Sequence, residues 1–308
     1  MNVPLWGWLT TFGVILLLLA ADLLGNRKAP DPSFTRSVVV SLMWIGVSIL
    51  FGIVLGFIYG SVTAQQYFAG YLVEKALSID NIFIFALLFR SFAVPPELQH
   101  RVLYFGVFGA LVMRGAFIAG GAQLVDHFTW VLYIFGVLLI LAGIRMLRGE
   151  GQINPDRNPV VRLFRHFMPV TKDYVGGQFF SRVDGRRAAT PLLVALVAIE
   201  VTDVVFATDS IPAIFGITTN VFVIFTSNAF AVLGLRALYF VFADAMDRFR
   251  YLKFGLAALL LAIGAKLLLA EVVHISILTN LVVIVVIIGA SLLASVLFGG
   301  DIETETGS

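Results

Sequence analysis

Five carboxylates stand in two apolar segments of the sequence, a setting in which ionised side chains are unusual. The first segment contains Glu74 and Asp80, and the second contains Glu200, Asp203 and Asp209. If these segments cross a membrane, each charged side chain costs at least about 2.5–3.5 kcal/mol, so it is retained only where it is paired, hydrated or functional. We therefore expect protons, basic side chains or a bound cation to neutralise these acids.

The spacing of the acids limits how they can act together. At about 100° per residue, Glu200 and Asp203 share one face of a helix, whereas a spacing of six residues places Asp209 about 120° from Asp203. The same spacing separates the two acids of the earlier segment. Either these helices unwind between their acids, or the acids have separate roles. Pro212 favours local distortion, because it cannot bond to the carbonyl of Thr208 and leaves that oxygen free as a ligand.

Three basic residues also fall in apolar segments, and we predict that they pair with the acids. These residues are Lys75, Arg114 and Arg236. The five acids and three bases together carry a net charge of −2, which one divalent cation would cancel. Lys266 is left out of this sum because it lies near a segment end and can extend to the surface. The alternative interpretation is that the charges only form buried salt bridges that stabilise the helices.

The available side chains suit a hard cation. Carboxylates, the amides of Asn81 and Asn228, the hydroxyls of Ser210 and Thr202 and a freed carbonyl all offer oxygen, which Mn²⁺, Mg²⁺ and Ca²⁺ prefer. The sequence has no cysteine, and its four histidines fall in loops or at segment ends. We therefore expect neither Zn²⁺ nor Cu⁺ at this site.

The composition of the 308 residues indicates a membrane protein, because 59% are hydrophobic and only 13% are charged. An ordinary soluble domain has about 25% charged residues. About 20 apolar residues span a hydrocarbon core, and the sequence shows no strand-like alternation. We predict an all-α polytopic membrane protein with nine transmembrane helices. The predicted spans are 5–24, 37–59, 70–90, 101–124, 128–147, 191–215, 221–243, 252–270 and 277–298.

The positions of the basic residues predict the orientation of the chain. The loops after the first, third, fifth and seventh spans hold 17 of the 21 lysines and arginines, whereas the other loops and the N-terminal tail hold none. Because positively charged loops stay on the cytoplasmic side, we predict that the N-terminus is outside and the C-terminus inside. The first span lacks the basic start and cleavage site of a secretory signal, so we expect it to be retained.

Spans three to five match spans six to eight, which predicts an internal repeat. Glu74 and Asp80 are spaced like Asp203 and Asp209, and a phenylalanine stands six residues before both Arg114 and Arg236. The predicted orientation makes this repeat of three helices inverted. Inverted repeats are typical of secondary transporters, whose site lies near the midplane where the halves meet.

These features divide the chain into six parts. The long basic loop is expected to contact lipid headgroups rather than nucleic acid or a protein partner, and residues 178–190 within it predict a short hairpin around Asp184 and Gly185. The parts are a first helix and cytoplasmic loop (1–36), helices two to five with the first repeat (37–147), the basic loop (148–190), helices six to eight with the second repeat (191–276), the ninth helix (277–300) and an acidic tail (301–308).

The two acidic segments resemble the TerC family of bacterial integral membrane proteins, which includes Alx-type members. The resemblance rests on EKALSIDNIFIFALLF at 74–89, IEVTDVVFATDSIPAI at 199–214 and the preceding RVDGRRAATPLL, and it covers residues 35–300. The family is linked with tellurite resistance by its name and with manganese efflux by its better-understood members. The resemblance implies a Mn²⁺ exporter of the bacterial cytoplasmic membrane, with Mg²⁺ or Ca²⁺ as alternative cargoes. The implied metal-site positions are Glu74, Asp80, Asn81, Glu200, Asp203, Asp209 and Ser210, and Thr208 and Asn228 are additional candidate ligands.

We expect proton-coupled transport rather than an enzyme reaction or a channel. Moving a divalent cation outward costs about 4.6 kcal/mol at an inside-negative potential of 100 mV. No nucleotide-binding motif is present to supply this energy. We therefore predict Mn²⁺/H⁺ exchange, with alternating access of the two repeats around Asp80 and Asp209.

Other functions would use the same acids. A LysE-like exporter of a basic solute would be inhibited by lysine rather than by Mn²⁺. A non-transporting scaffold of a metal or tellurite stress-response complex would depend on the loop at 148–187. An intramembrane aspartyl protease is disfavoured because its Gly-x-Gly-Asp motif is absent, and a retinal pump because Lys266 lies near the outer surface. The oligomeric state is left open.

Overall fold

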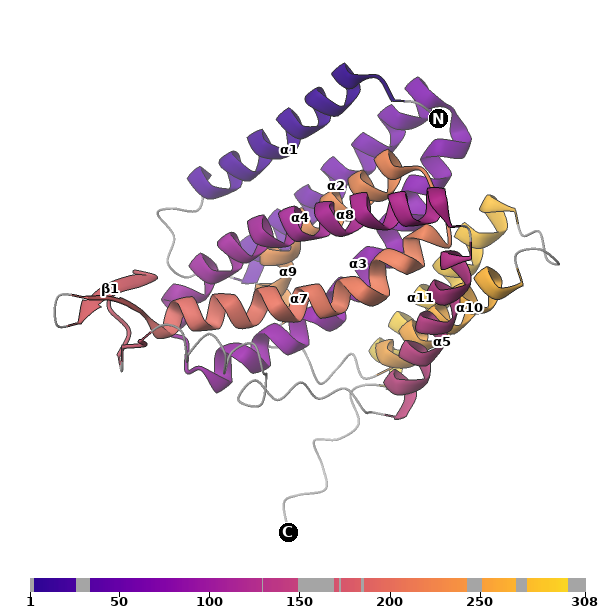
Figure 1. Cartoon of the computed structure of the whole chain (residues 1–308). Helices are drawn as coiled ribbons and strands as arrows, with labels where there is room; N and C mark the ends of the chain where they lie inside the picture. Colours follow the sequence, from indigo (N-terminus) through magenta and orange to yellow (C-terminus); the bar gives the residue numbers. More distant parts are fainter. Residues whose placement is uncertain are drawn as a thin grey trace, which may run out of the picture.

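The computed structural model describes residues 3–25, 34–128, 130–148, 169–171, 173–183, 186–242, 251–269 and 276–298. Long apolar helices make up nearly all of this part of the chain (Figure 1). A helix satisfies its own backbone hydrogen bonds, which is required where a membrane supplies no water. The predicted all-α polytopic membrane class is therefore confirmed. The acidic tail and most of the predicted basic loop fall outside the described residues.

The helices follow the predicted apolar segments closely. Segments 191–215 and 277–298 coincide with helices, and the helix expected at 70–90 begins nine residues earlier, directly after Gly60. The helices are α1 (Leu5–Gly25), α2 (Phe34–Tyr59), α3 (Ser61–Ser91), α4 (Pro96–His127), α5 (Val131–Arg148), α7 (Pro191–Phe215), α8 (Val221–Leu233), α9 (Leu235–Phe242), α10 (Leu252–Leu268) and α11 (Ile277–Phe298).

Six of the described helices are long and apolar enough to cross a membrane, or seven if α8 and α9 form one bent span. The six are α1, α2, α4, α5, α7 and α11. Even with α8 and α9 counted as one span, two of the predicted spans are absent from this set. α3 carries four charged residues that interrupt its apolar stretch, and α10 has only 17 residues. The prediction of nine spans, like the predicted orientation, stays a prediction.

The segment predicted as one helix over 221–243 is two helices in the structure, and this corrects the sequence interpretation. Asn220 caps the start of α8, and its side chain accepts hydrogen bonds from the backbone N–H groups of the first turn. The helix ends at Gly234, where the chain bends by 44° before α9 begins. Hydropathy is continuous across Gly234, so the apolar pattern could not reveal the bend.

Four helices form the centre of the structure, and the others pack around them. α3 packs against α8 and α7, and α4 packs against α7 and α8. Figure 1 shows α1 and α2 on one side of this centre, with α5, α10 and α11 on the other side. Residues on α3, α4 and α7 can therefore meet inside the structure, as the predicted site requires.

α5 and α10 cross at a contact between glycines. A Cβ atom on Gly264 would lie 2.8 Å from the backbone oxygen of Gly136, and a Cβ on Gly136 would lie 3.0 Å from the backbone oxygen of Gly264. Small residues let membrane helices approach closely, where dispersion contacts rather than hydrophobic burial hold them together. This crossing joins the third helix of each predicted repeat.

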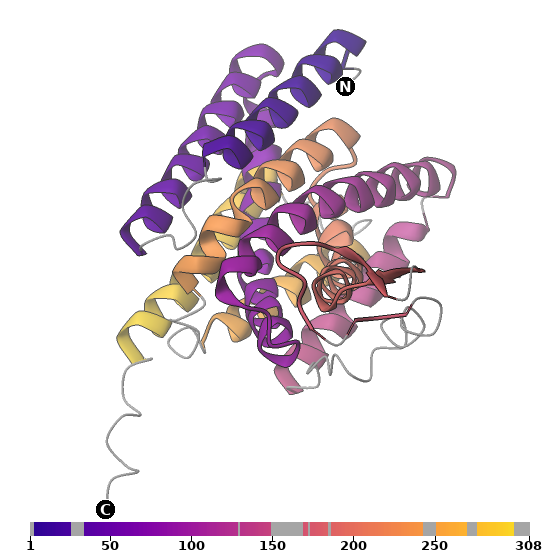
Figure 2. The ribbon, with the colours of Figure 1, turned by 90° about the vertical axis from the view of Figure 1, so that its left-hand side faces the viewer.

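A short antiparallel hairpin precedes α7, within the segment where the sequence predicts one. Its strands are β1 (Phe180–Val183) and β2 (Arg186–Ala189). The Tyr174 hydroxyl donates to the backbone oxygen of Phe92 at 2.7 Å, and burial raises the pKa of Tyr174 above its usual value. The Arg101 guanidinium lies 5.5 Å from the centre of the Phe179 ring. These contacts hold the hairpin against the α3–α4 connection, and Figure 2 shows it at the near end of α7.

Candidate ion site

Arg114 lies at the centre of a buried ion network formed by α3, α4 and α7. Its guanidinium donates two hydrogen bonds to Asp203, from Nε to Oδ2 at 2.9 Å and from Nη2 to Oδ1 at 2.8 Å. Its Nη1 donates to Oε1 of Glu74. The three side chains are at most 3% exposed. The arginine therefore joins one acid of each predicted repeat into a single group.

The network pairs its buried charges but does not use all of their bonding capacity. A guanidinium that contacts a carboxylate at two points forms one of the stronger ion pairs in proteins. The two acids still outnumber the one base, so the network carries a net negative charge. In addition, Oε2 of Glu74 is buried and has no hydrogen-bond partner among the described residues. This oxygen is available to a proton or a cation.

Glu200 lies one turn before Asp203 on the same face of α7. Its carboxylate packs on Gly109 of α4, where a Cβ atom would overlap the carboxylate oxygens. The side chain is half-buried, and its Oε2 has no hydrogen-bond partner among the described residues. Glu200 thus adds a third carboxylate beside the Arg114 network.

The central helices also carry polar atoms whose hydrogen bonds are incomplete. Asn81 is buried on α3. Ser78 Oγ, Ser210 Oγ and Asn228 Nδ2 are buried and lack partners among the described residues. Each such atom costs about 1–3 kcal/mol, so several on packed helices are unusual. A cavity of about 10 Å³ beside Asp203 is at the lower limit for one water molecule. The central helices therefore contain buried polar atoms that have no hydrogen-bond partner among the described residues.

The predicted acids do not all meet. α7 stays helical through Pro212, so the acids on it have separate positions rather than converging by unwinding. Asp209 is half-buried and lies almost two turns after Asp203 on α7. Thr208 is exposed, and its hydroxyl donates to a backbone carbonyl of the preceding turn at 2.6 Å. Asp80 belongs to α3, but its side chain lies outside the described residues.

Two of the three predicted base partners differ from the expectation. Lys75 donates from Nζ to the backbone oxygen of Ala231 at 3.1 Å rather than to an acid. Arg236 does pair with an acid, but Nη2 contacts Oδ1 of Asp22 on α1 at 2.6 Å. The bend before α9 directs Arg236 toward α1. Among the site acids whose side chains the structure describes, bonds are found to Arg114 but not to Lys75 or Arg236. Asp22 was missed, although it is the single acid in the first apolar segment.

No preformed metal cage is present in the described part of the chain. No three histidine, aspartate or glutamate side chains there converge in a way that could hold a metal ion. Glu74 and Asp203 instead share the guanidinium of Arg114. Two of the predicted metal ligands are therefore paired with an internal counter-ion, Arg114. The side chain of Asp80 lies outside the described residues.

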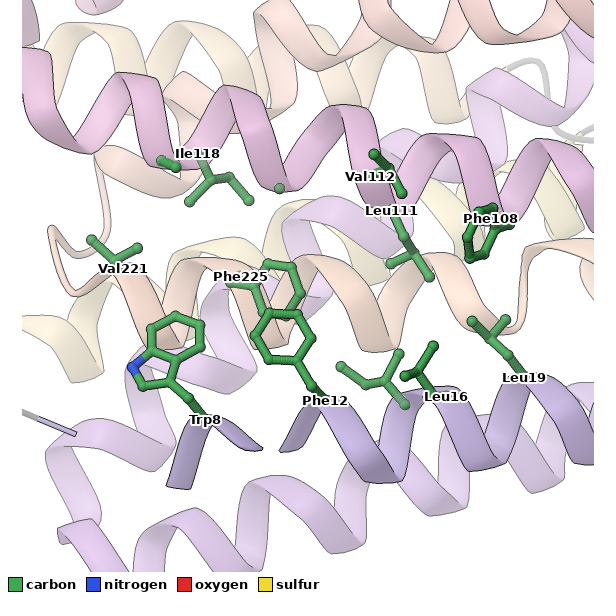
Figure 3. Close-up of a pocket in the computed structure, with 13 residues that line it drawn as sticks. Trp8, Phe12, Leu16, Leu19, Phe108, Leu111, Val112, Ile118, Val221 and Phe225 are labelled. Atoms are coloured by element: carbon green, nitrogen blue, oxygen red, sulfur yellow. The ribbon is translucent and has the colours of Figure 1, made fainter. Parts of the chain in front are cut away.

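An apolar pocket on the opposite side of α4 is not a candidate for an ion. It has a volume of about 460 Å³ and lies between α1, α4 and α8. Figure 3 shows Trp8 and Phe12 of α1 facing Phe225 of α8, with Leu111 of α4 close by. All of its lining residues are apolar or glycine. An ion would have no ligands there.

Comparison with known proteins identifies relatives along nearly the whole chain. Residues 59–301 match the sequence profile described as the integral membrane protein TerC family. The chain is 41% identical over 291 residues to a putative membrane-bound redox modulator Alx of Escherichia coli (strain K12), covering 91% of this chain and 90% of that protein. It is 39% identical over 292 residues to an uncharacterized membrane protein of Myxococcus xanthus, covering 94% of this chain and 92% of that protein. No solved structure matches the chain.

Proposed function

The chain belongs to the TerC family of integral membrane proteins, and we propose that it is a secondary transporter that exports a divalent metal cation, with Mn²⁺ as its cargo. The observation that carries this proposal is the buried network of Glu74, Arg114 and Asp203. Purely structural pairing would leave few unused polar atoms, whereas this network lies beside carboxylate oxygens without partners among the described residues.

In this proposal, Arg114 is the counter-ion of the empty site, and the cargo takes its place at Glu74 while Arg114 stays bonded to Asp203. Glu74, Asp203 and Glu200 together carry three negative charges, and Arg114 supplies one positive charge. One divalent cation would neutralise the remainder. Carboxylate, amide and hydroxyl oxygens suit Mn²⁺ or Mg²⁺, and the resemblance to the manganese-exporting members of the family favours Mn²⁺. Asp80 and Asn81, in the same acidic motif, are proposed as further ligands.

Proton exchange would supply the energy for export. Expelling two positive charges costs about 4.6 kcal/mol at 100 mV, inside negative. Protons entering in exchange return charge inward, and the carboxylates released by the cargo are the groups that would carry them. Glu200 is well placed for this role, because one of its oxygens is buried without a partner among the described residues.

An inverted repeat would give this site two-sided access, and mirrored contacts support it. In the proposed repeat, α3, α4 and α5 correspond to α7, α8–α9 and α10. α3 packs on α8 where Gly70 faces Ser227, and α7 packs on α4 where Gly106 faces Ile199. α5 and α10 cross at their glycines, each placing a backbone oxygen against the other. Such an arrangement is typical of transporters that alternate access around a midplane site.

We also propose that the basic hairpin contacts anionic lipid headgroups of the bacterial cytoplasmic membrane. Arg182 and Arg187 face each other across the strands, and both are exposed. Like charges in directly opposite positions repel, so a bound anion would stabilise this pair. The exposed side chain of Phe180 lies on the same face of the hairpin.

The name of the Alx relatives refers to redox modulation rather than to transport. A redox modulator that works through thiols needs cysteine, and this sequence contains none. A redox role of this chain would therefore have to use groups other than thiols.

Mn²⁺ transport by purified protein in liposomes tests the proposal. We expect Mn²⁺ flux driven by a proton gradient, and we expect Asp203→Asn and Glu200→Gln each to abolish it. Asp173→Asn is the matched control, since this acid is exposed outside the helices. Flux of lysine instead of Mn²⁺ would assign the acids to a basic solute. Unchanged Mn²⁺ flux in both site variants would reject the proposed site.

A further inference from the structure

At the break between α8 and α9, side chains of neighbouring helices approach the carbonyl groups at the end of α8. The last four carbonyls of a helix have no partner within it. One of these in α8, the carbonyl of Ala231, accepts from Lys75 Nζ of α3 at 3.1 Å. Ser48 Oγ of α2 donates to the Trp44 carbonyl at 2.8 Å and lies 3.4 Å from the carbonyl of Phe230. A positive charge at this end is also favoured by the helix dipole. Lys75 is therefore a cap for α8.

Gly234 makes room for this cap. A Cβ atom at Gly234 would lie 3.2 Å from Nζ of Lys75 and 3.0 Å from Cβ of Trp44. Trp44 is buried on α2 and has little freedom to move. A side chain at this position would press on the ammonium group or on α2, so the glycine and the lysine form one unit.

The first half of the proposed repeat has neither the break nor the cap. Counting from Arg236 and Arg114, Gly234 corresponds to Val112, and α4 runs through Val112 without a break. Counting from Glu74 and Asp203, Lys75 corresponds to Val204. The lysine and the helix break thus occur together where α3 meets α8, and both are missing where α7 meets α4, the corresponding contact of the proposed repeat. This co-occurrence links Lys75 to the bend rather than to neutralisation of the acids.

Lys75 is also the immediate neighbour of a site acid. Adjacent residues leave a helix about 100° apart, so Glu74 and Lys75 reach in different directions from one turn of α3. Glu74 reaches Arg114, and Lys75 reaches the end of α8. Any shift of this turn that accompanies a change at Glu74 must therefore move the cap.

We propose that Lys75 is a positioning residue that fixes the α8–α9 bend and couples it to the ion site through α3. The inference deepens the proposed transport function and rests on it for the role of the bend. When the cargo replaces Arg114 at Glu74, α3 shifts, Lys75 leaves the Ala231 carbonyl and α9 changes its angle to α8. Lys75 does not bind the cargo.

Transport and binding measured separately test this role. We expect Lys75→Met to lower the Mn²⁺ transport rate about tenfold or more, the loss expected when one charged hydrogen bond is removed. Mn²⁺ should stabilise the same variant with a midpoint at a lower Mn²⁺ concentration than in the wild type, because binding no longer has to break the cap. Lys75→Arg should retain transport, because it keeps the charge and the donor. Gly234→Ala should reproduce the loss with the lysine still present, and Gly46→Ala on the exposed side of α2 is the control.

A distance measurement makes the test independent of transport. Because the chain has no cysteine, cysteines introduced at Val221 and Val241 would carry the only two spin labels. In the ion-free protein, we expect one label distance for the wild type and a broadened or shifted distribution for Lys75→Met and Gly234→Ala. Wild-type distances in both variants would overturn the inference, whatever the cargo. The wild type could fail to bind or transport Mn²⁺ while the two variants still show these distance changes. That result would overturn the proposed cargo and keep Lys75 as the cap.

Discussion

Replacing Arg114 with methionine tests the buried network most directly. The change removes two hydrogen bonds to Asp203 and one to Glu74, and it leaves both carboxylates inside the helices without their shared cation. Breaking a buried ion pair by removing one partner costs about 3–5 kcal/mol. Because two acids lose their partner here, we expect the free energy of unfolding to fall by about 5 kcal/mol, the upper end of that range.

A charge-free variant separates electrostatics from packing. The triple variant Glu74→Gln, Arg114→Met, Asp203→Asn removes all three charges. It should recover most of the stability lost in Arg114→Met, since replacing a buried ion pair by uncharged side chains often changes stability little. Arg148→Met is the control, because this arginine is exposed at the end of α5 and should change stability by no more than about 0.5 kcal/mol.

Unfolding in mixed micelles titrated with denaturing detergent would measure these differences. The orphaned acids of Arg114→Met should also bind Mn²⁺ better than the wild type, and a ligand at 100 times its Kd stabilises by about 2.7 kcal/mol. A loss under about 1 kcal/mol for Arg114→Met, the value of a single ordinary hydrogen bond, would refute the reasoning. So would a charge-free variant as unstable as Arg114→Met.

Three further predictions follow from individual contacts. Asp22→Asn should lower the free energy of unfolding by about 1.5–3 kcal/mol, because Arg236 loses a charged partner. Thermal unfolding would measure the loss, and an unchanged stability would show that this ion pair does not stabilise the protein. Gly264→Ala should destabilise the α5–α10 crossing by about 1–3 kcal/mol, since its Cβ meets a backbone oxygen, whereas Gly13→Ala, which meets nothing within 4 Å, should be neutral in the same assay. Tyr174→Phe should cost about 0.5–1.5 kcal/mol at pH 7. Because its raised pKa favours the neutral hydroxyl in the folded state, the wild type should lose stability as the pH rises above 10.0, and Tyr174→Phe should lose less in a pH titration of unfolding.

Local features of the sequence predicted much of the architecture. Hydropathy is averaged over each segment, so it located α7 and α11 at their observed bounds and the other helices near theirs. It could not detect the bend at Gly234, because apolar residues continue on both sides of it. The charges of α3 had the opposite effect: they identified the candidate site and interrupted the apolar stretch by which a span is recognised.

The partners of the charged residues depend on the tertiary structure. The sequence alone determined the membrane class, the family and the unusual acids, since these follow from residue types and their spacing. Only the packing of α3, α4 and α7 decided that Arg114 joins Glu74 to Asp203. Likewise, only the bend and the position of α1 decided that Arg236 meets Asp22. A charge sum cannot distinguish these pairings, because ion pairing depends on which helix faces meet, and helix rotation and bending are set by contacts between distant parts of the chain.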